Sequence, residues 1–136
     1  MSEVRQSVDL SVITEAKKLT SLVFSITDKS PKKFRFTFVS RLQNLALDIV
    51  ESLFRANDTY FARDSSQHQL AERLELQHGA ATSARLVGYI AMLSLDQQCI
   101  LPKQFEQISE AVDVCQARLA SWVASDRRRL AGWAVG

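Results

Sequence analysis

Apolar side chains recur every three or four residues along most of the chain, which is the spacing that places them on one face of an α-helix. Four segments show this spacing, at residues of about 8–28, 31–62, 65–95 and 102–126. Long amphipathic segments joined by short connections are typical of antiparallel bundles. The pattern therefore predicts an all-α fold, an up-down-up-down four-helix bundle that forms a single domain over residues 1–136.

Three of the segments have one apolar seam each, which we expect to face the core. The first seam consists of Val12, Ala16, Leu19, Val23 and Ile26. The seam of the third segment consists of Leu70, Leu74, Gln77, Ala81, Ala84, Gly88, Ala91 and Leu95. The seam of the fourth consists of Phe105, Ile108, Val112, Cys115, Leu119 and Trp122.

The second segment is apolar over a wider arc. Its polar residues form one thin line of Thr37, Arg41, Asn44, Asp48, Glu51 and Arg55. Apolar residues lie on both flanks of it, with Phe34, Phe38, Leu45 and Ile49 on one and Phe36, Val39, Leu47, Val50 and Phe54 on the other. A surface helix of a monomer needs an apolar stripe of only about 100°. We therefore expect either that this helix is central in its own domain or that its second flank packs against another subunit.

Capping residues predict where three of the helices begin. Ser30 is a good N-cap, and Pro31 after it suits the first helical position. Asp64 with Gln67 fits a capping box, and Pro102 suits the start of the last helix. Gly79 opens a run of small residues that would let two helices approach closely, although a helix that breaks at this glycine is the alternative.

Composition agrees with one globular domain, because 46% of the 136 residues are hydrophobic and 24% are charged. The formal net charge of +2 does not by itself require a polyanionic partner. The cations are nevertheless clustered. A first region, with no acid inside it, contains Lys29, Lys32, Lys33, Arg35 and Arg41, and a second consists of Arg127, Arg128 and Arg129 in a basic C-terminal tail. In an up-down-up-down bundle these two regions should lie at opposite ends.

The first basic region has two interpretations that the sequence leaves open. Cations beside a helix start, where backbone N–H groups are free, are suited to phosphate contacts with a nucleic acid. The alternative is a solvated corner that keeps an apolar bundle in solution. Phe34 and Phe36 continue the seams of the second segment, so we expect them in a core or an interface rather than as base-stacking platforms.

Nothing in the sequence points to catalysis or to a metal. A single Glu-x-x-His motif occurs, at Glu75 and His78, whereas the di-iron bundles need a second copy and inward-facing glutamates. There is no Gly-rich phosphate loop, and Cys99 and Cys115 have no metal-ligand spacing, so we expect buried thiols. The chain also shows no signal peptide and no apolar run of membrane-spanning length. The sequence predicts a cytoplasmic, non-enzymatic protein with no cofactor, no metal site and no membrane contact.

The order of these signals resembles a known family. A first amphipathic helix is followed by SPKKFRFTFVSRLQNLALDIVESLFRAN, then by a helix rich in small residues, then by LPKQFEQISEAVDVCQARLASWV and a basic tail. The more specific marks are the Pro-Lys-Lys that begins at Pro31, the Arg-x-x-Asn from Arg41 to Asn44, and the Leu-x-x-Trp-Val from Leu119. In this order they resemble the Avd (accessory variability determinant) proteins of diversity-generating retroelements, relatives of the four-helix proteins encoded in ribosomal-RNA intervening sequences.

The resemblance implies a non-enzymatic partner of a reverse transcriptase that assembles as a homopentameric ring. It further implies contacts with template RNA or cDNA that support retroelement cDNA synthesis, with both basic regions as electrostatic contacts. Two alternatives remain open. One is a protein-binding scaffold bundle with no nucleic-acid contact, and the other is a metal-binding bundle that uses Glu75 and His78.

Overall fold

A computed structural model describes the backbone of residues 3–135 and the side chains of residues 11–134. Over this range the chain is helical outside its short connections, and it contains no strand. The elements in chain order are α1 (Glu3–Thr27), η1 (Lys32–Phe34), η2 (Arg35–Val39), α2 (Ser40–Asp58), α3 (Gln67–Asp96) and α4 (Pro102–Val135). The predicted all-α fold with four long helices is confirmed.

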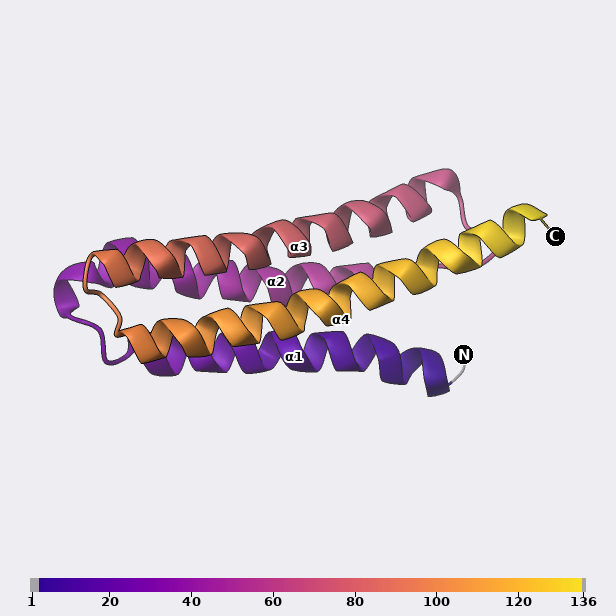
Figure 1. Cartoon of the computed structure of the whole chain (residues 1–136). Helices are drawn as coiled ribbons and strands as arrows, with labels where there is room; N and C mark the ends of the chain where they lie inside the picture. Colours follow the sequence, from indigo (N-terminus) through magenta and orange to yellow (C-terminus); the bar gives the residue numbers. More distant parts are fainter. Residues whose placement is uncertain (1–2, 136) are drawn as a thin grey trace.

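The four helices pack in the ring order α1, α2, α3, α4 and back to α1. Figure 1 shows the α1–η1 connection and the α3–α4 turn at one end of the molecule, and both chain termini at the other. The two predicted basic regions therefore lie at opposite ends. The core runs along the centre, where each helix contributes small or branched side chains such as Ala16, Ala46, Ala84 and Val112.

The predicted seams of the first and last helices are confirmed. All five residues of the α1 seam are buried, and so are five of the six predicted for α4; Phe105 is half-buried. Both helices keep a regular alternation of three and four residues, which holds one face toward the core. α4 nevertheless continues to Val135, about nine residues beyond the predicted end, because Asp126, Arg129 and Trp133 extend the same spacing.

The second predicted segment differs from the expectation at its start. Pro31 has extended backbone with φ −56° and ψ 139°, so the helical structure begins at Lys32 and no side chain caps it. The prediction of Ser30 as N-cap is therefore wrong. The segment also opens as one 3₁₀ turn (η1) and one π-helical turn (η2) before α2 becomes a regular α-helix.

The π turn changes which residues of this segment face inward. The buried line of α2 contains Leu42, Ile49 and Ala56 at seven-residue spacing. If the α-helix continued regularly toward the N-terminus, Arg35 would be the next residue on this buried line. The Ser40 N–H donates to the carbonyl of Arg35, five residues earlier, so the turn holds one extra residue. As a result Phe34 is half-buried against the core, while Arg35 lies exposed.

The residues of α2 that are buried differ from those of the two predicted apolar flanks. The core face of α2 consists of Leu42, Ala46, Ile49, Leu53 and Ala56, of which only Ile49 belongs to a predicted flank. The predicted polar line is confirmed, because all six of its residues are exposed. On the second flank, Phe36, Leu47 and Phe54 are 87%, 47% and 63% exposed, whereas Val39 is buried and Val50 is half-buried, so this flank is only partly covered within one chain.

α3 is unbroken through Gly79, so the alternative of a broken helix is wrong. Its capping box joins Ser66 and Gln69, two residues after the predicted pair: the Gln69 N–H donates to Ser66 Oγ, and the Ser66 N–H donates to Gln69 Oε1. The buried face consists of Arg73, Gln77, Ala80, Ala84, Val87, Ala91 and Ser94. Three of the eight predicted seam positions belong to it, because the helix is rotated toward the side that carries Arg73.

Candidate nucleic-acid interface

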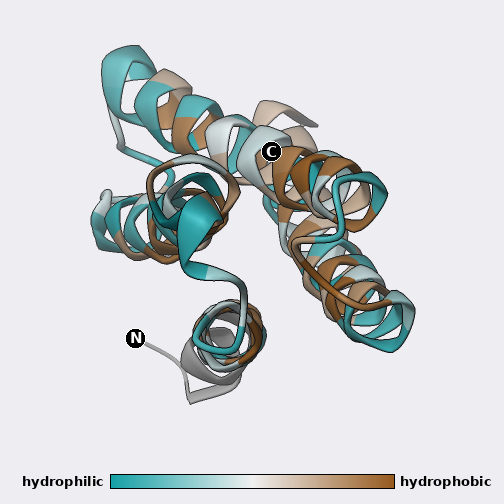
Figure 2. Cartoon of the chain, turned by 90° about the vertical axis from the view of Figure 1, so that its left-hand side faces the viewer, coloured by the Kyte–Doolittle hydropathy of each residue, from teal (hydrophilic) through white to brown (hydrophobic). Residues whose placement is uncertain are grey.

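The five cations of the first basic region gather at the end of the bundle where α1 turns into α2. Lys29 follows α1, Lys32 and Lys33 lie in η1, Arg35 opens η2, and Arg41 lies in the first turn of α2. All five side chains are exposed. Figure 2 views this end directly, and the connection between α1 and η1 is coloured as hydrophilic. The clustering predicted from the sequence therefore becomes a clustering in space.

Charge on this end is not neutralised by ion pairs within the described chain. The ion pairs found among residues 11–134 involve Lys18, Arg55, Arg73 and Arg129, and none of the five cations takes part. Lys33 Nζ lies 5.1 Å from the centroid of the Phe34 ring, a cation–π contact that orders the lysine without removing its charge. Asp28 is the nearby acid along the chain, and it is exposed as well.

Two hollows open on this surface, and Phe36 contributes to both. The larger, of about 590 Å³, lies between the end of α1, the connection and η2, and Lys32, Arg35 and Asp28 line it. Gln43 Nε2 donates to Thr27 Oγ1 at 3.0 Å across its wall. The smaller hollow, of about 300 Å³, is lined by Phe36, Thr37, Phe38, Arg41 and Ile90. The sequence did not predict either hollow, and residues of the π turn line both.

The second basic region divides into exposed and buried parts. Arg127 and Arg128 are exposed and line a groove of about 950 Å³ between α3 and α4, together with Arg85 and His78. Arg129 is half-buried, donates to Asp126 Oδ1 at 2.7 Å, and lies 4.2 Å from the Phe61 ring centroid. Two of the three predicted arginines are thus free to reach a ligand, while the third contributes to the packing of α4.

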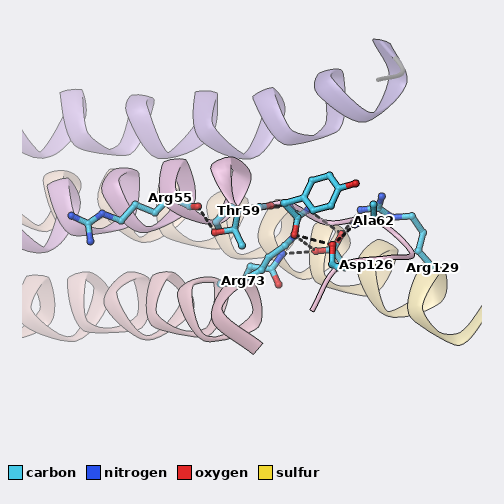
Figure 3. Close-up of polar contacts among 10 residues, drawn as sticks. Arg55, Thr59, Ala62, Arg73, Asp126 and Arg129 are labelled. Carbon is cyan, nitrogen blue, oxygen red and sulfur yellow. Dashed lines mark hydrogen bonds and ion pairs between the residues drawn. The ribbon is translucent and has the colours of Figure 1, made fainter. Parts of the chain in front are cut away.

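A buried polar cluster lies beside this second region (Figure 3). Asp126 accepts two hydrogen bonds from Arg73, at 2.8 and 3.1 Å, and one from Gln77 at 2.8 Å. Arg73 also donates to the carbonyls of Ala56 and Thr59 and lies between aromatic rings, 4.6 Å from Phe61 and 4.8 Å from Trp122. The guanidinium therefore joins the end of α2, the following loop and α4.

The protonation of Asp126 follows from these contacts. Burial alone would raise the pKa of this carboxyl group, but the hydrogen bonds and charge of Arg73, with Arg129 and Gln77, hold the pKa below its ordinary value. Arg73 and Asp126 were not predicted as a pair. A signal existed, since Asp126 continues the seam spacing of α4 from Leu119 and Trp122, but nothing in the sequence indicated its partner on α3.

A metal site at Glu75 and His78, the alternative that the sequence left open, finds little support in the geometry. Glu75 and His78 are both exposed on α3, and among the described residues no three His, Cys, Asp or Glu side chains gather as a metal site would require. The prediction that both cysteines are buried is confirmed. Burial raises the pKa of Cys115 to about 11, and the charge of Glu15 adds to this, so the thiol is a poor nucleophile.

The arrangement at the first basic region is suited to binding a polyanion through its cations, with backbone and aromatic groups close by. Within residues 3–135, no helix has both the length and the apolar character needed to cross a membrane. Comparison of the chain with models of protein families and with curated proteins found no match in either case.

Proposed function

We propose that this chain is a non-enzymatic accessory protein that binds a reverse transcriptase together with template RNA or cDNA and supports retroelement cDNA synthesis. The proposal begins from the resemblance to Avd proteins given by the Pro31, Arg41 and Leu119 motifs. The observation that carries it is the group of five exposed cations from Lys29 to Arg41, which form no ion pair within the described chain. Such a surface attracts phosphates independently of base sequence.

The proposal includes an up-down-up-down arrangement of the bundle and its assembly as a homopentamer. The exposed apolar flank of α2 supports self-association, because Leu47 and Phe54 are large apolar side chains that a single chain leaves in water. A ring of subunits would repeat the first basic region around its circumference. Several equivalent cationic sites on one particle raise the overall affinity for a long polyanion well above that of each site.

Replacing Lys32 and Lys33 together by glutamine tests the nucleic-acid contact. RNA affinity should fall, and the slope of log affinity against log salt should become shallower by about 1.4, because each lost phosphate contact on a single strand removes about 0.7. The measurement is RNA binding over a salt series, accompanied by capture of the polymerase. Lys17 and Lys18 are also exposed and adjacent, on α1, so the matched Lys17→Gln/Lys18→Gln variant serves as control.

A scaffold that holds protein partners without nucleic acid is the second candidate, and the exposed Leu47 and Phe54 favour it. In that case the Lys32→Glu/Lys33→Glu charge reversal should leave polymerase capture and cDNA synthesis intact. RNA binding that is absent, or that does not depend on salt in the unaltered protein, would reject the nucleic-acid function.

A further inference from the structure

Phe36 is the most exposed large hydrophobic side chain among the described residues, with 87% of its surface accessible. Its neighbours Phe34 and Phe38 pack against the core and against each other, with ring centroids 5.8 Å apart. Exposure of a phenyl ring to water is unfavourable by the hydrophobic effect. The π turn is what places Phe36 here, since the extra residue rotates this part of the segment outward. Single-turn π segments occur frequently at functional sites.

The surroundings of the ring are cationic on two sides. Phe36 lines both the hollow that contains Lys32 and Arg35 and the hollow that contains Arg41. The ring therefore stands between two open spaces, and each space has at least one guanidinium or ammonium group. Asp28 is the one acid that lines either hollow. An aromatic side chain among cations in an open groove is the arrangement that single-stranded nucleic-acid binding proteins use.

The walls of the larger hollow distinguish a nucleic acid from an apolar partner. They are polar for the most part, with Thr27, Ser30, Ser40 and Gln43 beside the charged residues. An apolar protein side chain seated there would remove the exposed charged groups of Asp28, Lys32 and Arg35 from water without replacing their hydrogen bonds, which is unfavourable. A nucleotide has a flat apolar face for the ring and polar edges and phosphates for the walls.

Resting on the proposed function, we propose that Phe36 is a stacking platform for an unpaired base of single-stranded RNA or cDNA. The phosphates next to that base would lie on Lys32 and Arg35 on one side and on Arg41 on the other. Stacking needs a free base face, which a duplex does not offer along its length. The site therefore selects single strands, whereas the cations alone would bind single and double strands alike.

Substitution of Phe36 separates stacking from charge. Phe36→Ala should weaken binding of an oligouridylate roughly 5- to 100-fold, because stacking on one aromatic ring contributes that much per base. The salt slope should stay unchanged, since no cation is lost, and binding of duplex RNA should change little. Phe36→Trp should retain or strengthen single-strand binding, because the indole has a larger π face. Fluorescence anisotropy at several salt concentrations measures all of these.

Two further variants make the result decisive. Phe36→Leu keeps an apolar side chain without a π face, so it should behave as Phe36→Ala does; full recovery by leucine would overturn stacking in favour of an apolar contact. Tyr89→Ala removes another exposed aromatic ring, 57% accessible and outside both hollows, and should leave RNA affinity unchanged.

The outcomes also separate this inference from the proposed function. If Phe36→Ala binds the oligouridylate as tightly as the unaltered protein while Lys32→Gln/Lys33→Gln weakens it, the stacking platform is rejected and the electrostatic contact stands. If the unaltered protein binds no RNA, both are rejected. Because Phe36 is 87% exposed, its substitution should leave the helical circular dichroism unchanged.

Discussion

Asp126 and Arg73 form an ion pair in which both side chains are almost fully removed from water, with exposures of 1% and 0%. A buried pair of this kind does not in itself imply high stability, since the loss of hydration offsets much of the attraction. Its geometry does fix the position of α4. The carboxylate joins α4 to α3, and the guanidinium continues to the carbonyls at the end of α2.

Replacing Asp126 by asparagine should lower the free energy of unfolding by about 3 kcal/mol, because the Arg73 charge would remain buried without its counter-ion. Urea or thermal denaturation measures the change. Asp113→Asn is the matched control on the same helix, since that carboxylate is exposed, and it should change stability by no more than about 0.5 kcal/mol. A loss below about 1 kcal/mol for Asp126→Asn would contradict the importance of the pair. The double variant Arg73→Met/Asp126→Leu should recover most of the loss.

The same carboxyl group predicts how stability depends on pH. Its pKa is lower in the folded chain than in the unfolded chain, where it is about 3.9. The stabilisation from Asp126 is therefore complete above the unfolded pKa and is lost as the pH falls through the folded pKa. The difference in unfolding free energy between the unaltered protein and Asp126→Asn should be constant near neutral pH and should shrink in acid. A difference that grows in acid would contradict the direction of the shift.

At the scale of single helices, α3 contains a glycine without a packing role. A Cβ atom built on Gly79 would meet no atom within 4 Å, and the residue is exposed, so the expected close helix approach is wrong at this position. At Gly88 the added Cβ would lie 4.0 Å from Val112 Cγ1, an ordinary contact. Neither glycine is required by the backbone, because neither has a positive φ angle.

Gly79→Ala should therefore stabilise the protein by about 1 kcal/mol, the difference in helix propensity between the two residues. The melting temperature should rise by about 4 °C for a chain of this size. Ala117→Gly, at an exposed position inside α4, is the reverse control and should lower stability by a similar amount. An unchanged or lower melting temperature for Gly79→Ala would indicate a role for this glycine beyond the single chain.

At the scale of the whole molecule, the exposed flank of α2 predicts self-association. Leu47 and Phe54 are 47% and 63% exposed and lie seven residues apart on one face of α2, C-terminal to the cations of the first basic region. We expect the protein to form oligomers at micromolar concentration, with Leu47→Gln/Phe54→Gln shifting the mass toward a single chain. Light scattering after size-exclusion chromatography measures this. Leu101→Gln is the control, because Leu101 is 64% exposed in the α3–α4 turn, outside that flank.

A single-chain mass for the unaltered protein would reject the ring and, with it, the repeated cationic surface on which multivalent binding depends. If the oligomer persists in Leu47→Gln/Phe54→Gln but dissociates in Leu101→Gln, the subunit interface lies at the end of the bundle that contains the α3–α4 turn. Either result leaves the Phe36 inference open to its own test, because that inference needs only one chain.

Local periodicity determined the four helices and the inner faces of α1 and α4. The five seam residues of α1 are buried as predicted, since a regular α-helix fixes which side chains share a face. The polar line of the second segment and the buried Cys115 follow from the same rule. The clustering of Lys29 to Arg41 is likewise a property of the sequence, because residues so close in the chain cannot lie far apart.

Contacts between helices decided the rest. Arg73 has the polarity of a surface residue, and only the approach of Asp126, 53 positions later, makes its burial possible. The π turn has no reliable local signal; it accompanies the packing of Phe34 against the core, with Arg35 and Phe36 left exposed. The sequence by itself thus determined four helices and a basic corner, while the tertiary structure decided their rotation and the exposure of Phe36, because burial depends on neighbours that local spacing does not specify.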